Sequence, residues 1–236
     1  YPRAFQKWQQ TQSPRESGPR AETPIVTARV VSRDQVTKDH DIVARQVDAI
    51  DQATQEAILP DFCPEDRLPQ VSRHIRQAVQ RGIRRFRVTS LYGLAMLRKY
   101  PDLVVTASFP LPVSNSEAFR ELSGLGVHRA TAWLELDAES VKQLAARLPG
   151  RIEAFAYGRP PLLTTRAVLP VHDETVTDAR GNSFYVESCS DGLSRLYPSA
   201  VMSVPVPAHL DRYVDFTHAA QEKERTSRFN WDRLLQ

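Results

Sequence analysis

Short runs of alternating apolar and polar residues recur along the chain, and stretches with apolar positions three or four apart separate several of them. The runs predict strands and the spaced stretches predict helices, because side chains alternate along a strand and recur about every 3.6 residues along a helix. We expect strands at 25–31, 57–62, 86–91, 104–109, 129–135, 151–157, 200–205 and 212–217. Helices are expected within 33–54 and at 68–81, 116–124 and 138–148, with Ser114 or Asn115 and then Asp137 as amino-terminal caps.

Strands that alternate with helices predict α/β units around a parallel sheet. Parallel strands buried on both faces should be almost wholly apolar, yet one face of these strands carries charged, hydroxyl or aromatic residues. In 151–157, for example, Glu153, Phe155 and Tyr157 share one face. The pattern predicts a TIM-like (β/α) barrel with a polar lumen, although the sequence leaves its complete closure open. An open sheet with a partly solvated face is the alternative.

The ends of the chain differ from its middle. Residues 1–22 are polar and without periodicity, which predicts a linker or extended tail, and 23–236 are expected to form the barrel domain. A turn entering a hairpin strand, inserted in the barrel, is expected at 178–188. Because the sequence starts at Tyr1, we expect it to be a piece of a longer protein.

Charges inside a barrel must be paired, so we expect Arg87 to pair with Glu153 or Glu135. Arg159 follows the strand at 151–157 and precedes two prolines, which stiffen a loop at the end of the barrel where binding sites lie. Two roles for Arg159 remain open. It is either a clamp for an anionic substrate or the partner of Glu153 or Glu135 in an ion pair.

A long cationic segment stands out in a chain whose formal net charge is only +3. No Asp or Glu occurs between Arg67 and Pro101. The segment suits a phosphate backbone, and the predicted nucleic-acid-binding residues are Arg73, Arg76, Arg81, Arg84 and Arg85. The alternative is a solvated helix face with buried pairings for Arg85 and Arg87.

Several classes of function find little support. The two cysteines, Cys63 and Cys189, cannot make a four-cysteine metal site, so no metal site is predicted. No Gly-x-Ser-x-Gly, His-Glu-x-x-His or glycine-rich phosphate loop occurs. No apolar run approaches the roughly 18 residues of a membrane helix, so we expect no membrane partner. Two buried thiols in a cytoplasmic protein are favoured over the alternative, a disulfide between the two cysteines.

The segment that begins at Tyr157 carries a family resemblance. Gly158, Arg159, Pro161, Leu162 and Leu163 resemble the Gly-Arg-x-Pro-Leu-Met run of the collagenase-like peptidase U32 family. Weaker matches follow the family's order. They are Gly82-Ile83 before Leu91-Tyr92-Gly93-Leu94, Leu111–Ser116, Leu125-Gly126-Val127 before Glu135-Leu136, and Asp178–Phe184. Together the matches cover roughly residues 68–206.

The resemblance implies a TIM-like barrel and a set of possible activities. The family is named for collagenase-like peptidases, and its better-understood members hydroxylate RNA bases or a quinone precursor with cysteine-ligated iron–sulfur clusters. Here Val168 stands where the first cluster cysteine is expected. We therefore expect no cofactor in this chain, and any iron–sulfur cluster would belong to the parent protein.

The implied function is that of a degenerate, non-catalytic barrel domain of an RNA-modifying protein. It would bind rRNA or tRNA, or scaffold other domains of the parent protein. The predicted substrate-binding residues are Arg87, Asn115, Glu135, Glu153, Tyr157 and Arg159. An active peptidase, an active iron–sulfur hydroxylase and a plain protein-interaction domain are the alternatives.

Overall fold

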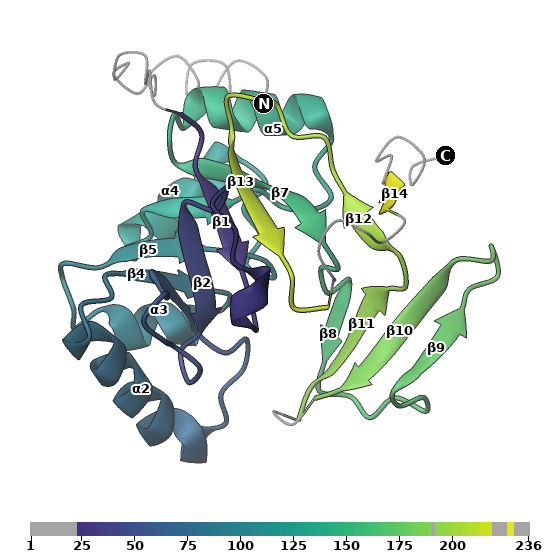
Figure 1. The fold of residues 1–236 in the computed structure, drawn as a ribbon, viewed down its shortest axis with the longest axis horizontal. Helices are drawn as coiled ribbons and strands as arrows, with labels where there is room; N and C mark the ends of the chain where they lie inside the picture. The colour runs from purple at the N-terminus through teal and green to yellow at the C-terminus, as the bar shows by residue number, and fades with distance from the viewer. Residues whose placement is uncertain (1–22, 190–191, 219–225, 229–236) are drawn as a thin grey trace, which may run out of the picture.

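The computed structural model describes residues 23–189, 192–218 and 226–228. Eight parallel strands form a closed barrel (Figure 1). They are β1 (Val26–Arg29), β2 (Ile42–Gln46), β3 (Glu56–Ile58), β4 (Arg85–Val88), β5 (Val104–Ala107), β6 (Arg129–Thr131), β7 (Ile152–Gly158) and β13 (Asp211–Asp215). The last strand, β13, closes the barrel because it pairs in parallel with both β1 and β7. The prediction of a TIM-like barrel is confirmed.

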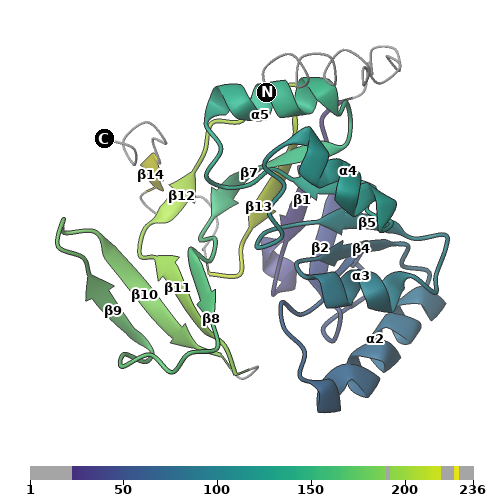
Figure 2. The ribbon, with the colours of Figure 1, turned by 180° about the vertical axis from the view of Figure 1, so that it is seen from behind.

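The α-helices follow β3, β4, β5 and β6 in the chain and cover that side of the barrel (Figures 1 and 2). They are α2 (Leu68–Gln80), α3 (Leu91–Leu97), α4 (Ser116–Gly124) and α5 (Ala138–Arg147), with 3-10 turns η1 (Arg33–Gln35) and η2 (Glu65–Arg67). The predicted caps are confirmed, because Asn115 accepts a hydrogen bond from the Ala118 amide at 2.8 Å and Asp137 accepts one from the Ser140 amide at 2.7 Å. Within the described residues, no helix has the length and apolar character needed to cross a bilayer.

A second, antiparallel sheet is inserted after β7 and lies beside the barrel (Figure 1). Its order is β8-β11-β10-β9, from β8 (Leu163–Thr165), β9 (Glu174–Thr177), β10 (Ser183–Ser188) and β11 (Ser194–Pro198). The predicted hairpin joins β9 to β10, where the Asp178 carboxylate accepts the amides of Arg180 and Asn182. Two further strands, β12 (Val201–Ser203) and β14 (Thr226–Arg228), extend the barrel sheet beyond β7.

The two faces of the barrel strands differ as the sequence predicts. Apolar side chains such as Ala57, Phe86 and Ala130 pack outward in the main hydrophobic core, together with the buried faces of the helices. The lumen instead holds a buried network around Arg87, which donates to Glu56 at 2.6 Å and to Glu153 at 2.5 Å. The predicted pairing of Arg87 with Glu153 is therefore confirmed.

Aromatic rings lie next to this network. The Arg87 guanidinium stacks 4.1 Å from the centroid of the Tyr213 ring. Tyr213, Phe109 and Phe155 contact one another with centroid separations of 5.9 to 6.4 Å. Since Arg87 and Glu153 are each only 1% exposed, the lumen is a packed core and not a channel.

Two local predictions are wrong. The segment 33–54 is not a helix, because Ile42–Gln46 form β2, whose neighbours β1 and β3 satisfy its backbone. Tyr157 does not share a face with Phe155, because a bulge in β7 shifts the register with β13. That extra residue turns Tyr157 toward the outer cluster, where its ring lies 5.7 Å from that of Phe216.

Candidate functional site

A cavity of about 470 Å³ opens at the carboxyl ends of several barrel strands, between the barrel and the second sheet. We call it the mouth cavity. In α/β barrels this end carries the binding site, because loops that follow the strands converge there. Its ionisable lining includes Arg29, Asp61, Arg67, His74, Arg159, Glu187, Cys189, Arg195, Asp215 and His218.

Two ion pairs fix the walls of the mouth cavity. Arg29, at the end of β1, lies 3.2 Å from Asp215, at the end of β13. Arg195 of β11 lies 3.1 Å from Asp61, which also accepts a hydrogen bond from the Thr89 hydroxyl at 3.1 Å. The second pair ties the inserted sheet to the loop after β3, so the cavity depends on both parts of the fold.

A thiol, a carboxylate and an imidazole meet on one side of the cavity. The Cys189 thiol donates to Glu187 Oε2 at 3.3 Å, and His218 Nε2 lies 3.7 Å from the same oxygen. The ring of His218 also lies 4.4 Å from that of Tyr197. Burial, with a contribution from Glu187 in the same direction, raises the pKa of Cys189 to about 11 against the opposing positive charge of Arg195. About one thiol in 10,000 is therefore ionised at pH 7.

Burial also lowers the pKa of His218 below its ordinary value. The thiol and the imidazole are therefore both neutral near pH 7. A nucleophilic cysteine requires a different balance, in which positive neighbours favour the thiolate more than burial disfavours it. The cluster therefore links the thiol and the imidazole through the Glu187 carboxylate.

The residues predicted to bind substrate are not all brought together. Arg159 lines the mouth cavity, at the position that its stiff loop predicts. Arg87 and Glu153 lie in the packed lumen, and Tyr157 packs on the outer cluster. Glu135 is exposed and accepts from the Trp133 indole at 3.2 Å, and Asn115 caps α4. Their binding roles stay predictions, and only Arg159 has the placement that such a role needs.

The ion-paired residues of the mouth are not among the residues predicted from the sequence. Arg29 and Asp215 are the last residues of β1 and β13, and Asp61 comes soon after β3. Polar residues at carboxyl ends of barrel strands are a usable signal, so these three positions were within reach of prediction. Arg195 carries no comparable signal, because only the placement of the inserted sheet brings it to the barrel.

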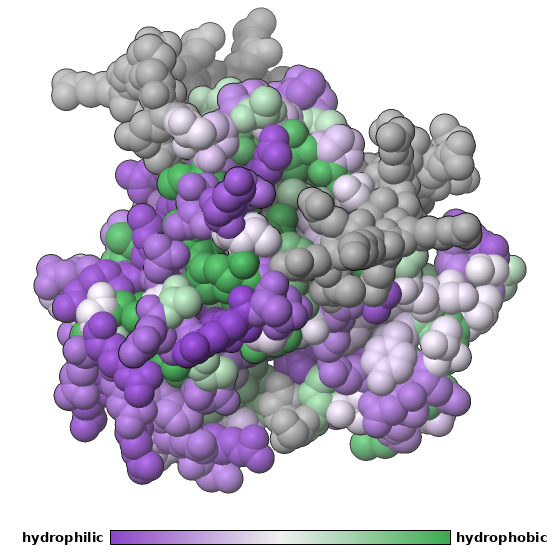
Figure 3. All heavy atoms as spheres, viewed as in Figure 1, coloured by the Kyte–Doolittle hydropathy of each residue, from purple (hydrophilic) through white to green (hydrophobic). Residues whose placement is uncertain are grey.

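A second candidate surface lies along α2 and the turn that follows it. We call Arg73, Arg76, Arg81, Arg84 and Arg85 the cationic face. Arg85 is half-buried and the other four side chains are exposed. Within the described parts of the chain, none of the five pairs with a carboxylate. The surface over α2, at the lower left of Figure 3, is correspondingly hydrophilic.

The residues of this chain do not fit an iron–sulfur cluster. Such clusters need cysteine thiolates, usually four, and the whole chain has two cysteines. Burial raises the pKa of both thiols, which disfavours the thiolate form that ligation requires. Val168, at the position where the family resemblance predicts the first ligand, is 89% exposed.

Fold and site together define an α/β barrel with a ligand-sized cavity at its carboxyl end. The family model described as peptidase family U32 matches residues 52–176, which is more than half of the chain. The chain therefore belongs to the peptidase U32 family.

The U32 peptidase Mk0906 is similar at 19% identity and a TM-score of 0.45, over 61% of this chain and 72% of that one. An aldolase, QR15, is similar at 12% identity and a TM-score of 0.33, over 50% of this chain and 66% of that one. No curated protein matches the chain.

Proposed function

We propose that this chain is a non-catalytic U32 barrel domain that binds RNA on behalf of an RNA-modifying parent protein. The observation that carries the proposal is the cationic face, whose arginines have no carboxylate partner among the described residues. Exposed guanidinium groups that are not neutralised attract a phosphate backbone and release its counterions on binding.

The position of α2 supports the proposal. Arg67, Gln70 and His74 at the start of the helix line the mouth cavity, and Arg81 follows its last turn. The helix has 13 residues and is therefore about 20 Å long. A single RNA strand that follows α2 would contact Arg73 and Arg76 along the way and present a nucleotide to the mouth.

The side chains at the mouth support a non-catalytic role. Thiols held neutral supply neither a nucleophile nor the ligands of a cluster. Four further charged groups form the pairs Arg29–Asp215 and Arg195–Asp61, which stabilise the cavity walls. Binding and architecture are the roles that this arrangement supports.

The test compares two double variants in RNA binding by fluorescence anisotropy, with labelled single-stranded RNA. Arg73→Gln/Arg76→Gln removes two charges from α2, and Lys142→Gln/Arg147→Gln removes two from exposed positions of α5. We expect the α2 variant to weaken binding about tenfold and the α5 variant to leave it within about twofold, since only the former removes phosphate contacts. Equal weakening by both variants would show a non-specific charge effect and contradict the proposal.

A further inference from the structure

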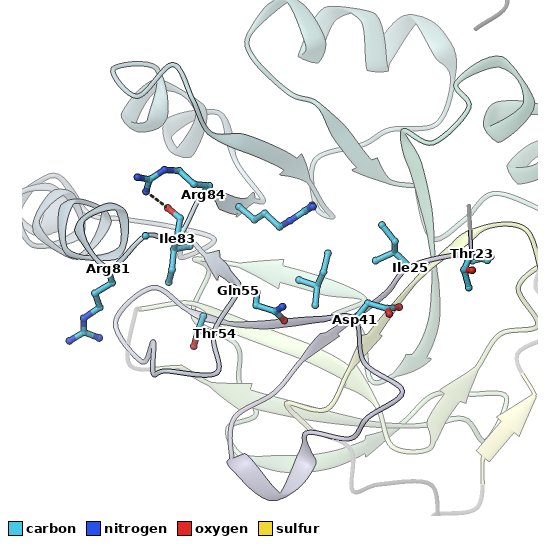
Figure 4. Close-up of a pocket in the computed structure, with 12 residues that line it drawn as sticks. Thr23, Ile25, Asp41, Thr54, Gln55, Arg81, Ile83 and Arg84 are labelled. Atoms are coloured by element: carbon cyan, nitrogen blue, oxygen red, sulfur yellow. Dashed lines mark hydrogen bonds between the residues drawn. The ribbon is translucent and has the colours of Figure 1, made fainter. Parts of the chain in front are cut away.

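A second cavity, of about 540 Å³, lies at the opposite end of the barrel. We call it the floor pocket. It is bounded by the amino ends of β1 to β4 and by the turn between α2 and β4 (Figure 4). Its volume falls within the range of small-molecule sites, roughly 300–1,000 Å³. The mouth cavity lies at the carboxyl ends of the strands, so the two sites are distinct.

The floor pocket has an excess of positive charge. Arg81, Arg84 and Arg85 line it, and Asp41 is the one acidic residue among the described residues that line it. The Asp41 carboxylate is already engaged, because it accepts a hydrogen bond from the Val26 amide at 2.7 Å. Figure 4 shows Arg81 and Arg84 at one end of the pocket and Asp41 at the other. The acid therefore does not neutralise the arginine end.

Backbone carbonyls orient two of these arginines without cancelling their charge. Arg84 Nη1 donates to the carbonyl of Val79 at 2.8 Å and to that of Ile83 at 3.1 Å. Arg81 Nη1 donates to the Ile50 carbonyl at 3.3 Å. Each contact uses one nitrogen of a guanidinium that has five donors, so further N–H groups remain for a ligand.

The third arginine, Arg85, is the first residue of β4 and is half-buried. Burial of a guanidinium is costly unless an anion or hydrogen-bond acceptor compensates it. Its lumen neighbour on the same strand, Arg87, is compensated by Glu56 and Glu153. Arg85 makes no ion pair with any described residue, which leaves its charge available in the pocket.

We propose that the floor pocket binds the phosphate group of a nucleotide, held by the donors of the half-buried Arg85, with the exposed Arg81 and Arg84 at the arginine end of the pocket. Guanidinium groups suit phosphate because they offer parallel donors in a plane and stay charged. Two sources share this chemistry, a free nucleotide and the terminal phosphate of an RNA chain. The second source rests on the proposed function, whereas the first does not.

The probes are adenosine 5′-monophosphate and adenosine, titrated into the full chain by calorimetry. We expect the monophosphate to bind and adenosine to bind at least about tenfold more weakly, because it lacks the charged group. Arg84→Gln/Arg85→Gln should weaken monophosphate binding at least about tenfold, and Arg84→Lys should weaken it less, since it keeps the charge and loses the fork. The thermal midpoint of each variant reports whether it folds. If the double variant does not fold, the exposed single variant Arg81→Gln should still weaken binding about threefold.

Equal binding of adenosine and its monophosphate, or unchanged monophosphate binding in the folded variants, overturns the inference. Competition by 5′-phosphorylated RNA but not by 5′-hydroxyl RNA supports the terminal phosphate as the source. Competition by neither supports the free nucleotide. The Arg73→Gln/Arg76→Gln variant should retain monophosphate binding, because neither residue lines the floor pocket. If the wild type does not bind the monophosphate but this variant loses RNA affinity, the floor-pocket inference fails and the proposed function stands.

Discussion

Arg87 of β4 and Glu153 of β7, 66 residues apart in the chain, form an ion pair of 2.5 Å across the barrel lumen, with each side chain 1% exposed. Glu56 holds the same guanidinium from β3 at 2.6 Å, so three strands meet at one cation. Polar contacts in the interior of this barrel therefore help to determine which strands face one another.

Replacing Arg87 with Leu should lower the free energy of unfolding by about 3–5 kcal/mol, because two buried carboxylates lose their counter-ion. Urea unfolding followed by circular dichroism measures the change. The control is Glu117→Gln, which breaks an exposed pair with Arg120 and should cost less than about 1 kcal/mol. Similar costs for both variants would contradict the structural role of the lumen network.

Stability should fall in acid. Burial raises the pKa of Glu153. The positive charge of Arg87 and the hydrogen bonds that the carboxylate accepts lower it by more in sum, so the pKa lies below the ordinary 4.5. The carboxylate therefore contributes stability that is present above pH 4.5 and is lost as the pH falls through the lower folded value. Unfolding measured between about pH 7 and pH 3 should show this loss, and Glu153→Gln should reduce the slope in the acid range. If the free energy of unfolding falls equally steeply with pH in the variant, groups other than Glu153 cause the loss of stability in acid.

Gly158 should not tolerate a larger residue. Its φ is +134°, and a Cβ atom added there would lie 2.3 Å from the carbonyl oxygen of Asp215 on β13. Gly158→Ala should therefore combine backbone strain with a clash at the closing strand pair. Gly126→Ala is the matched control, because its φ is +100° and no atom lies within 4 Å of the added Cβ. We expect Gly158→Ala to cost about 1–3 kcal/mol more than the control in unfolding free energy.

Cys189 should react slowly with iodoacetamide at neutral pH. In a Cys63→Ser background, the rate should rise with pH toward a midpoint near 11, because burial and Glu187 disfavour the thiolate. Glu187→Gln removes the nearby negative charge and should lower the midpoint. A wild-type midpoint near the free-thiol value of about 8.5 would contradict the neutral cluster at the mouth.

The predictable parts of the fold are those that depend on local periodicity. The helices α4 and α5 follow from the spacing of their apolar residues, and their first turns follow from the caps Asn115 and Asp137. The Arg87–Glu153 pair follows from strand faces that are too polar for an ordinary parallel sheet. β2 was missed because apolar residues around Ile42 also fit a helix, and only pairing with β1 and β3 selects the strand.

The rest of the candidate site depends on contacts distant in sequence. A bulge in β7 turns Tyr157 outward, and no residue type marks it in the sequence. Arg195 and Glu187 reach the mouth because the inserted sheet lies against the barrel. The predicted tail at 1–22 lies outside the described residues.

The most direct test of RNA binding by the cationic face is the salt dependence of affinity for single-stranded RNA. Each phosphate contact contributes about 0.7 to the slope of log affinity against log salt concentration. The slope of the Arg73→Gln/Arg76→Gln variant should therefore be shallower than that of the wild type by about 1.4. The α5 variant Lys142→Gln/Arg147→Gln should retain the wild-type slope. A slope unchanged by the α2 substitutions would contradict the proposal that α2 binds the RNA backbone.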